Sequence, residues 1–242
     1  MKALILAAGV GSRLAPLTND RPKALVDVLG RSFLLRQLDR LAAAGIAARD
    51  VVIVGGYRVD QLRATLAREG LPCTVVLNER YAEWNNFYSV LAAEKALAGH
   101  AYVQLDGDVI LDEKLLPRLL AAPGEVALAV DVRPELDEET MKVRLADGRA
   151  AAISKQLDPA TCAGEYIGIT KLSAAASTAV FAELARFPAE GLTHEYYEYA
   201  FDRLMSSGRV PFSIVDVHDC SVLEIDTVAD LAVAEDILRR RG

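Results

Sequence analysis

The stretch from residue 6 to residue 25 reads LAAGVGSRLAPLTNDRPKAL and gathers glycine, proline and basic residues directly after an apolar run. Gly9 and Gly11 would let backbone amides approach a phosphate group closely. Arg13 and Lys23 would add two positive charges, and the prolines between them would stiffen the loop. A rigid basic loop suits a polyphosphate and the charge that develops during phosphoryl transfer. The pattern predicts a polyphosphate site, with a surface loop of solvated cations as the alternative.

Two common nucleotide-binding loops are excluded. A dinucleotide-binding loop needs GxGxxG at the start of a helix, whereas Leu14 stands at the third glycine position and Pro16 would interrupt a helix. A Walker loop needs GKS or GKT, which the sequence lacks. A polyphosphate would therefore be bound by a different kind of loop.

Acidic residues stand at the ends of two later strand-like runs. Asp106 and Asp108 belong to LDGDV, and Asp226 closes the EID at 224–226. Ligands of open α/β sheets bind beyond the carboxyl ends of the strands, so these carboxylates are expected at one edge of the sheet. Carboxylate oxygens are ligands for Mg²⁺, with phosphate and water completing the coordination. We predict Asp108 and Asp226 as metal ligands, with ordinary turn or capping aspartates as the alternative.

The order of apolar patterns predicts an α/β fold. Runs such as ALILAA, VVIVGG, CTVVLN and AYVQLD alternate with helical patterns over the first half, which predicts a Rossmann-like, mostly parallel central sheet with helices on both faces. In the second half, EVALAVDV, MKVRLAD and RAAAISK follow one another, and Asp147-Gly148 signals a hairpin, so a small antiparallel insertion is expected. Helices are also predicted at NFYSVLAAEKALAG, at THEYYEYAFDRLMSSG and at the closing TVADLAVAEDILRRRG.

Composition narrows the class of protein. The net charge of −7 over 242 residues disfavours nucleic acid as a partner. The sequence contains no run of 18 apolar residues, so no membrane span is expected, and the short apolar start predicts a cytoplasmic protein. Cys73, Cys162 and Cys220 are widely spaced and signal neither a zinc site nor a disulfide framework.

The string LILAAGVGSRLAPLTNDRPKAL resembles the signature of the nucleoside-triphosphate transferases, which include sugar-1-phosphate nucleotidylyltransferases and bacterial cytidylyltransferases. LDGDV near 105 and EIDTVADL near 224 extend the resemblance. It implies a GT-A-like nucleotidyltransferase fold and EC 2.7.7 activity, with Mg²⁺ as cofactor on Asp108 and Asp226. The catalytic residues implied are Arg13 and Lys23. The nucleotide-binding residues are Leu6, Ala7, Ala8, Gly9, Gly11, Ser12, Arg13, Asn85, Asn86 and Asp106.

The segment NERYAEWNNFYSVLAAEKAL bears on the identity of the nucleotide. Asn85-Asn86 could cap the helix that follows, which would be a sufficient structural reason for one of the two. The string also resembles the NN-x-x-S pattern of bacterial phosphocholine and 2-aminoethylphosphonate cytidylyltransferases. This resemblance favours CTP as donor, since amide groups can read the cytosine edge.

A further set of residues is predicted to bind the acceptor. Lys155 falls where sugar-type relatives have the lysine of an EKP motif, although the glutamate and proline are missing here. GEYIGITKLS and LTHEYYEYAF supply Glu165, Tyr166, Tyr197 and Glu198, which would suit a cationic head group through carboxylates and aromatic faces. The alternative is a helix with an aromatic face in the core and solvated glutamates outside.

Together these features predict a Mg²⁺-dependent cytidylyltransferase that uses CTP and a small phosphate or phosphonate acceptor of the phosphocholine or 2-aminoethylphosphonate type. A sugar-1-phosphate or polyol-phosphate nucleotidylyltransferase and a catalytically inactive nucleotide-binding regulatory module remain as alternatives. We expect a single domain over residues 1–242, in which residues 1–125 bind the nucleotide and residues 126–242 bind the acceptor. The choice of phosphate or phosphonate stays open, and so does assembly into a homo-oligomer.

Overall fold

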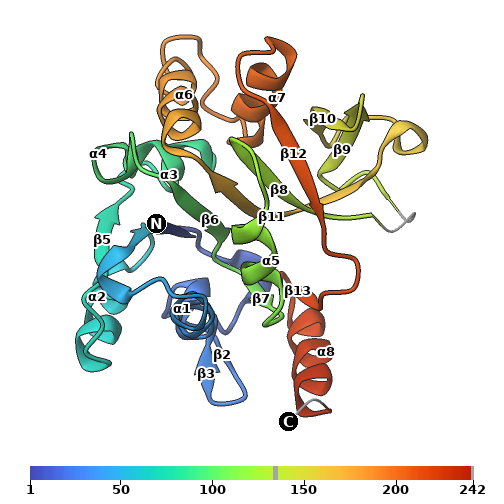
Figure 1. Cartoon of the computed structure of the whole chain (residues 1–242). Coiled ribbons are helices and arrows are strands. Elements are labelled where there is room, and N and C mark those ends of the chain that lie inside the picture. Colours follow the sequence, from blue (N-terminus) through green and yellow to red (C-terminus); the bar gives the residue numbers. More distant parts are fainter. Residues whose placement is uncertain (133–135, 241–242) are drawn as a thin grey trace.

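A nine-stranded mixed sheet runs through the centre of the molecule, in the order β5-β4-β1-β6-β11-β8-β12-β10-β9 (Figure 1). The computed structural model describes residues 1–132 and 136–240. The strands are β1 (Lys2–Ala7), β2 (Asp27–Val28), β3 (Arg31–Ser32), β4 (Val51–Gly55), β5 (Thr74–Leu77), β6 (Tyr102–Asp106), β7 (Val109–Leu111), β8 (Val126–Asp131), β9 (Lys142–Ala146), β10 (Arg149–Ser154), β11 (Gly164–Leu172), β12 (Phe212–Asp216) and β13 (Val222–Glu224). The helices are α1 (Phe33–Ala43), α2 (Val59–Arg68), α3 (Phe87–Ala92), α4 (Glu94–Leu97), α5 (Leu115–Ala121), α6 (Ala174–Leu184), α7 (Glu198–Ser206) and α8 (Val228–Arg239).

The first half of the chain forms the parallel part of the sheet. Strand β1 pairs in parallel with β4 on one side and with β6 on the other, and β5 extends the sheet beyond β4. The carboxyl ends of β1, β4 and β6 therefore lie at one edge, as the alternation of strand and helix patterns predicts. The Rossmann-like core is confirmed in this half.

The second half adds antiparallel strands to the same sheet. Strand β11 lies between β6 and β8 and is antiparallel to both, while β12 pairs in parallel with β8. The hairpin β9–β10 turns at Asp147, whose φ of 50° matches the predicted hairpin turn. The antiparallel insertion is confirmed, and it reaches further than the sequence indicates because β11 enters the middle of the sheet.

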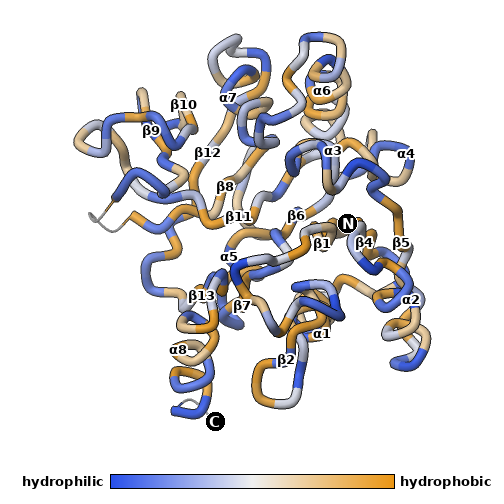
Figure 2. Tube along the Cα trace, turned by 180° about the vertical axis from the view of Figure 1, so that it is seen from behind, coloured by the Kyte–Doolittle hydropathy of each residue, from blue (hydrophilic) through white to orange (hydrophobic). Residues whose placement is uncertain are grey.

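Side chains that alternate along the buried strands supply two hydrophobic layers. Leu4 of β1 and Tyr102 of β6 belong to the layer under α3, α4, α6 and α7. Ile5 and Leu105 point to the opposite layer, which α1, α2 and α5 cover (Figure 1). Because both faces are covered, the central strands β1, β4 and β8 are apolar along most of their length, and the central sheet carries the hydrophobic colour in Figure 2.

A third, smaller cluster joins the end of the chain to its beginning. Ala234 of α8 and Ile225 pack with Leu14, Val28 and Phe33. Strand β13 pairs with β7 at the same place. This packing holds the segment after β13 beside the first loop and the end of β6.

Two predicted helices differ from those observed. The helix expected from Asn86 onward is divided, because α3 ends at Ala92 and α4 is a separate single turn. The helix expected from Thr193 begins at Glu198, after an irregular segment that contains Tyr196. The closing helix is confirmed, with a capping box between Thr227 and Asp230, although its last two predicted residues lie outside the described part. Within residues 1–132 and 136–240, no helix combines the length and apolar character needed to cross a membrane.

Candidate active site

A cleft of about 570 Å³ opens at the sheet edge where β1 and β6 end. Among the described residues, eight carboxylates and two basic side chains line it. The acidic lining residues are Asp106, Asp108, Asp137, Glu139, Glu165, Glu198, Glu224 and Asp226, and the basic ones are Arg13 and Lys155. The other lining residues are Leu6, Ala8, Gly9, Asn86, Ser89, Gly107, Val109, Thr140, Met141, Tyr166, Ile167, Gly168 and Tyr196. The predicted carboxyl edge of the sheet is thus a cleft with a strong excess of negative charge.

An ion-pair group stands at the end of the cleft nearest the first loop. Lys23 Nζ donates hydrogen bonds to Asp108 Oδ2 and to Asp226 Oδ1, each at 2.7 Å. Arg13 Nη2 lies 2.8 Å from Asp226 Oδ2. Burial opposes the charge on Lys23, yet the two carboxylates outweigh that effect and raise the pKa of the lysine. Lys23 is therefore a fixed cation, whereas the Arg13 side chain is 69% exposed and can move toward a ligand.

Backbone geometry explains how the first loop brings Lys23 to this place. Gly11 has a φ of 70°, and a Cβ there would lie 2.8 Å from Lys23 Cβ. The Thr18 hydroxyl donates to the Gly11 carbonyl and closes the loop. Across the edge, a Cβ on Gly107 would lie 2.1 Å from the Leu6 carbonyl oxygen. Glycine is required at both positions because the lysine and the LDGDV turn pass so close to β1 and its loop.

Three carboxylates in this group could hold a metal ion. Asp108, Glu224 and Asp226 each place a carboxylate oxygen within 4.8 Å of the others. Desolvation of the carboxylate in the cleft, together with the charges of Asp108 and Asp226, raises the pKa of Glu224 to about 7. An all-oxygen anionic set matches the preference of Mg²⁺, so the residues present fit such an ion. Glu224 was not predicted, although it stands two residues before Asp226, on the same face of an extended segment.

Asp106 lies away from this group, at the bottom of the cleft. It is held by the Tyr197 hydroxyl, which lies 3.2 Å from both carboxylate oxygens, and Tyr197 in turn meets the Tyr166 hydroxyl at 3.1 Å. Burial and the nearby charges of Glu198 and Asp108 raise the pKa of Asp106 well above its usual range. Burial likewise raises the pKa of Glu198 to about 7. The bottom of the cleft, by which we mean the part lined by Asp106 and Glu198, is thus a partly buried acidic site supported by tyrosines.

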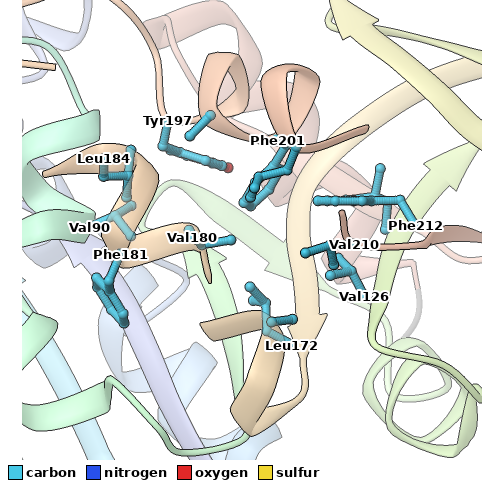
Figure 3. Close-up of a cluster of buried hydrophobic side chains, with 14 of the residues drawn as sticks. Val90, Val126, Leu172, Val180, Phe181, Leu184, Tyr197, Phe201, Val210 and Phe212 are labelled. Carbon is cyan, nitrogen blue, oxygen red and sulfur yellow. The ribbon is translucent and has the colours of Figure 1, made fainter. Parts of the chain in front are cut away.

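Tyr197 supports this site from the hydrophobic core. The residue is fully buried among aromatic and aliphatic side chains, including Phe201 and Leu184, and is absent from the described cleft lining (Figure 3). Its predicted role was to bind the acceptor directly. The observed geometry makes it a residue that positions Asp106 instead, with its hydroxyl as the polar end of a packed ring.

An irregularity in β11 makes room for the Asp106 carboxylate. The pairing of β11 with β8 shifts between Tyr166 and Thr170, and Gly168 there has a φ of 73°. A Cβ on Gly168 would lie 2.5 Å from Asp106 Oδ2. Such a bulge re-aims the side chains around it, and Glu165 and Tyr166 face the cleft before it. The sequence offered one signal for this bulge, because Gly168 stands alone inside the strand pattern GEYIGITKLS and an isolated glycine in a strand indicates a bulge.

The two asparagines tie together segments that are far apart in the sequence. Neither side chain caps α3, so the capping interpretation is wrong. Asn85 Nδ2 donates to the His194 carbonyl, and Asn86 Oδ1 accepts from the Tyr197 amide at 2.9 Å. Asn86 also lines the cleft. Through its bond to the His194 carbonyl, Asn85 helps to hold the segment formed by residues 193–197.

The remaining predicted residues fall into two groups. Lys155 lines the cleft, donates to Glu139 at 3.1 Å and lies over the Tyr196 ring. Leu6, Ala8 and Gly9 also line the cleft. Ala7 packs in the hydrophobic layer, and Ser12 begins a short 3-10 turn outside the described lining. The sequence interpretation did not single out the lining residues Asp137, Glu139, Ser89 and Gly168.

A profile for the MobA-like NTP transferase domain matches residues 3–193. The chain belongs to this family. Among solved structures, this NTP transferase resembles the CTP:phosphocholine cytidylyltransferase of Streptococcus pneumoniae with a TM-score of 0.79 and 27% identity, over 98% of both chains. The inositol-1-phosphate CTP transferase of T. maritima has the same TM-score at 22% identity, over 98% of this chain and 94% of the other. The predicted GT-A-like nucleotidyltransferase fold is confirmed.

Curated relatives of this NTP transferase include several cytidylyltransferases. The choline-phosphate cytidylyltransferase of Streptococcus pneumoniae R6 is 39% identical over 106 residues, which is 44% of either chain. The CMP-5'-(3-aminopropyl)phosphonate synthase of Streptomyces rubellomurinus is 31% identical over 97% of this chain and 38% of the relative. These two matches therefore span less than half of the relatives' length. The CTP:phosphoglutamine cytidylyltransferase of Campylobacter jejuni is 28% identical over 72% of this chain and 73% of the relative.

The raised pKa of Glu198 predicts a pH-dependent cost to the stability of this NTP transferase. The carboxyl ionises near 4.5 when unfolded and near 7 when folded, so the cost is absent below pH 4.5 and grows as the pH rises through 7. Glu198→Gln should therefore gain about 3 kcal/mol in free energy of unfolding, relative to the wild type, between pH 4.5 and pH 8. Urea unfolding at both pH values measures this gain. The exposed Glu113→Gln is the matched control, and an unchanged difference at both pH values would contradict the assignment.

Proposed function

We propose that the chain is a cytidylyltransferase that transfers CMP from CTP to a small phosphate or phosphonate acceptor and releases pyrophosphate. The observation that carries the proposal is the ion-pair group of Lys23 and Arg13 with Asp108 and Asp226, at the sheet edge where ligands of this fold class bind. The likeness to the CTP:phosphocholine cytidylyltransferase over 98% of both chains supports CTP as donor. The choline-phosphate cytidylyltransferase and the CMP-5'-(3-aminopropyl)phosphonate synthase support a small charged acceptor.

The chemistry requires positioning and neutralisation of charge. An oxygen of the acceptor's phosphate or phosphonate attacks the α-phosphorus of CTP, and a new P–O bond forms. The bond from the α-phosphorus to the bridging oxygen breaks, and pyrophosphate leaves with the electron pair. Since the attacking oxygen is already ionised near neutral pH, no general base is needed. Fixed cations such as Lys23 match this requirement.

The first loop supplies the groups that meet the triphosphate. The backbone around Gly9 lines the cleft, and a Cβ on Gly9 would have no heavy atom within 4 Å, so a phosphate can approach this backbone. Arg13 is free to turn from Asp226 toward the β- and γ-phosphates, since its side chain is 69% exposed. Lys23 remains between the two aspartates and faces the charge that develops at the α-phosphate.

The cofactor we propose is Mg²⁺, with Asp108, Glu224 and Asp226 as the residues that would hold it. When bound, such an ion neutralises phosphate charge and orients the phosphate oxygens. Lys23 Nζ already contacts two of these carboxylates, so the protein keeps a positive charge beside them. The three carboxylates and the lysine thus form one unit, in which the cations balance the acidic side chains.

The nucleobase and the acceptor are assigned to the two halves of the chain. Asn86, of the half formed by residues 1–125, has an NH₂ group that can donate to the acceptor atoms on the cytosine edge. The half formed by residues 126–242 supplies Lys155, Glu165, Tyr166 and Glu198 to the cleft. We assign the first half to CTP and the second to the acceptor within a single domain.

Pyrophosphate release in the presence of Mg²⁺ tests this proposal directly. The four ribonucleoside triphosphates and dTTP are each combined with phosphocholine, 2-aminoethylphosphonate, phosphoethanolamine and glucose-1-phosphate. We expect turnover with CTP and an amine-bearing acceptor. Turnover with glucose-1-phosphate would instead indicate a sugar nucleotidylyltransferase, and CTP binding without turnover would indicate a regulatory module.

Removal of one metal-binding charge should abolish most of the turnover. Asp108→Asn keeps the side-chain volume but loses a carboxylate that pairs with Lys23, so we expect kcat to fall by about 10²-fold or more with little change in melting temperature. Asp147→Asn, in the exposed hairpin turn, is the matched control and should keep the wild-type rate. Steady-state pyrophosphate release measures both variants. A wild-type rate for Asp108→Asn at saturating Mg²⁺ would refute the metal assignment.

The role of Asn86 predicts a selective loss of CTP affinity. Asn86→Asp retains an oxygen that accepts from the Tyr197 amide but replaces the NH₂ donor with a carboxylate oxygen. The KM for CTP should rise about tenfold or more, while the melting temperature stays close to that of the wild type. Kinetics with varied CTP and a thermal melt provide the two readouts. An unchanged KM for CTP would remove Asn86 from the nucleotide site.

A further inference from the structure

One carboxylate at the bottom of the cleft lacks a partner for one of its oxygens. Glu198 lines the cleft and is 6% exposed, and its Oε2 atom has no hydrogen-bond partner among the residues that the structure describes. Leaving a buried acceptor unpaired is unfavourable, so such an atom is expected where a ligand completes its bonding. The ligand group that fits a buried anionic acceptor is a cation that carries N–H donors.

The surroundings of Glu198 reinforce this requirement for a cation. Asp106 and Glu165 line the same cleft as Glu198. Lys155 is the basic lining residue whose charge reaches Glu198, and its ammonium group is already paired with Glu139. A positive group on the acceptor would therefore relieve repulsion between these neighbouring carboxylates, in addition to filling the unpaired position.

The aromatic side chains do not form an enclosure for a quaternary ammonium group. Recognition of trimethylammonium uses several ring faces around the cation. In the described lining, the aromatic residues are Tyr166 and Tyr196. The ring of Tyr196 already carries Lys155 Nζ at 5.5 Å from its centroid, and Trp84 stacks on Phe87 outside the described lining. A trimethylammonium group also has no N–H to donate to Glu198.

We propose that Glu198 binds the ammonium group of the acceptor, and that this acceptor carries a primary ammonium, as an aminoalkyl phosphate or aminoalkylphosphonate does, in preference to trimethylammonium. The inference rests on the proposed cytidylyltransferase function and names the acceptor class for the same cleft. The acceptor would extend from its phosphate, near Lys23 and Asp108, to its ammonium at the bottom. Tyr197 and Tyr166 would hold the acidic site in place from below.

The test compares three acceptors on the wild type and on Glu198→Gln. They are 2-aminoethylphosphonate, phosphocholine and ethylphosphonate, which lacks the ammonium group. For the wild type, kcat/KM for 2-aminoethylphosphonate should exceed that for phosphocholine at least tenfold. In Glu198→Gln, the KM for 2-aminoethylphosphonate should rise at least tenfold, while kcat/KM for ethylphosphonate and the KM for CTP stay within twofold. Glu113→Gln is the matched control on the surface.

Calorimetric titration of each acceptor into the Mg²⁺-loaded protein separates the two proposals. If no acceptor supports turnover, the cytidylyltransferase proposal fails, whereas the titration still decides whether 2-aminoethylphosphonate binds more tightly than phosphocholine and loses that advantage in Glu198→Gln. Equal or tighter binding of phosphocholine overturns the inference. An equal loss for ethylphosphonate and 2-aminoethylphosphonate in the variant also overturns it, because Glu198 would then be a structural residue.

Discussion

The salt bridges of Lys23 with Asp108 and Asp226 join three parts of the chain that are separated by 85 and 203 residues. The lysine belongs to the first loop, Asp108 follows β6, and Asp226 follows β13. Because the side chain of Lys23 is only 12% exposed, its charge must be matched by nearby carboxylates. Each partner in turn needs the lysine, since three carboxylates with oxygens within 4.8 Å would otherwise repel one another. The site that we assign to the triphosphate depends on this balance.

The rest of the architecture serves to bring these charges to one edge of the sheet. Parallel pairing of β1 with β6 places the first loop beside the LDGDV turn, and the Gly107 position permits contact with the Leu6 carbonyl. Packing of α8 with the segment around Leu14 fixes the position of Asp226. The hydrophobic layers therefore determine where the polar groups lie, although they take no part in the chemistry.

The bottom of the cleft differs from the first loop in how its charges are balanced. At the first loop, cations and carboxylates are paired, whereas at the bottom the half-buried Asp106 and the buried Glu198 lie in one acidic site and hold their protons more tightly. Tyr197 supports Asp106 from a ring that is fully packed in the core. Two neighbouring carboxylates favour a positively charged ligand, because binding of the ligand removes the electrostatic repulsion between them.

The sequence by itself determined the alternation of elements, the covered central sheet, and the gathering of glycines and basic residues in the first loop, because these follow from local periodicity and from residue types at short spacing. It also indicated Asp108 and Asp226 as a pair. Only the tertiary structure decided that Glu224 joins them, that Tyr197 lies beneath the cleft and that β11 runs antiparallel through the middle of the sheet. These outcomes depend on contacts between distant segments. The register of β11, its bulge at Gly168 and the turn before α7 set the direction of each side chain, and no local pattern encodes such directions.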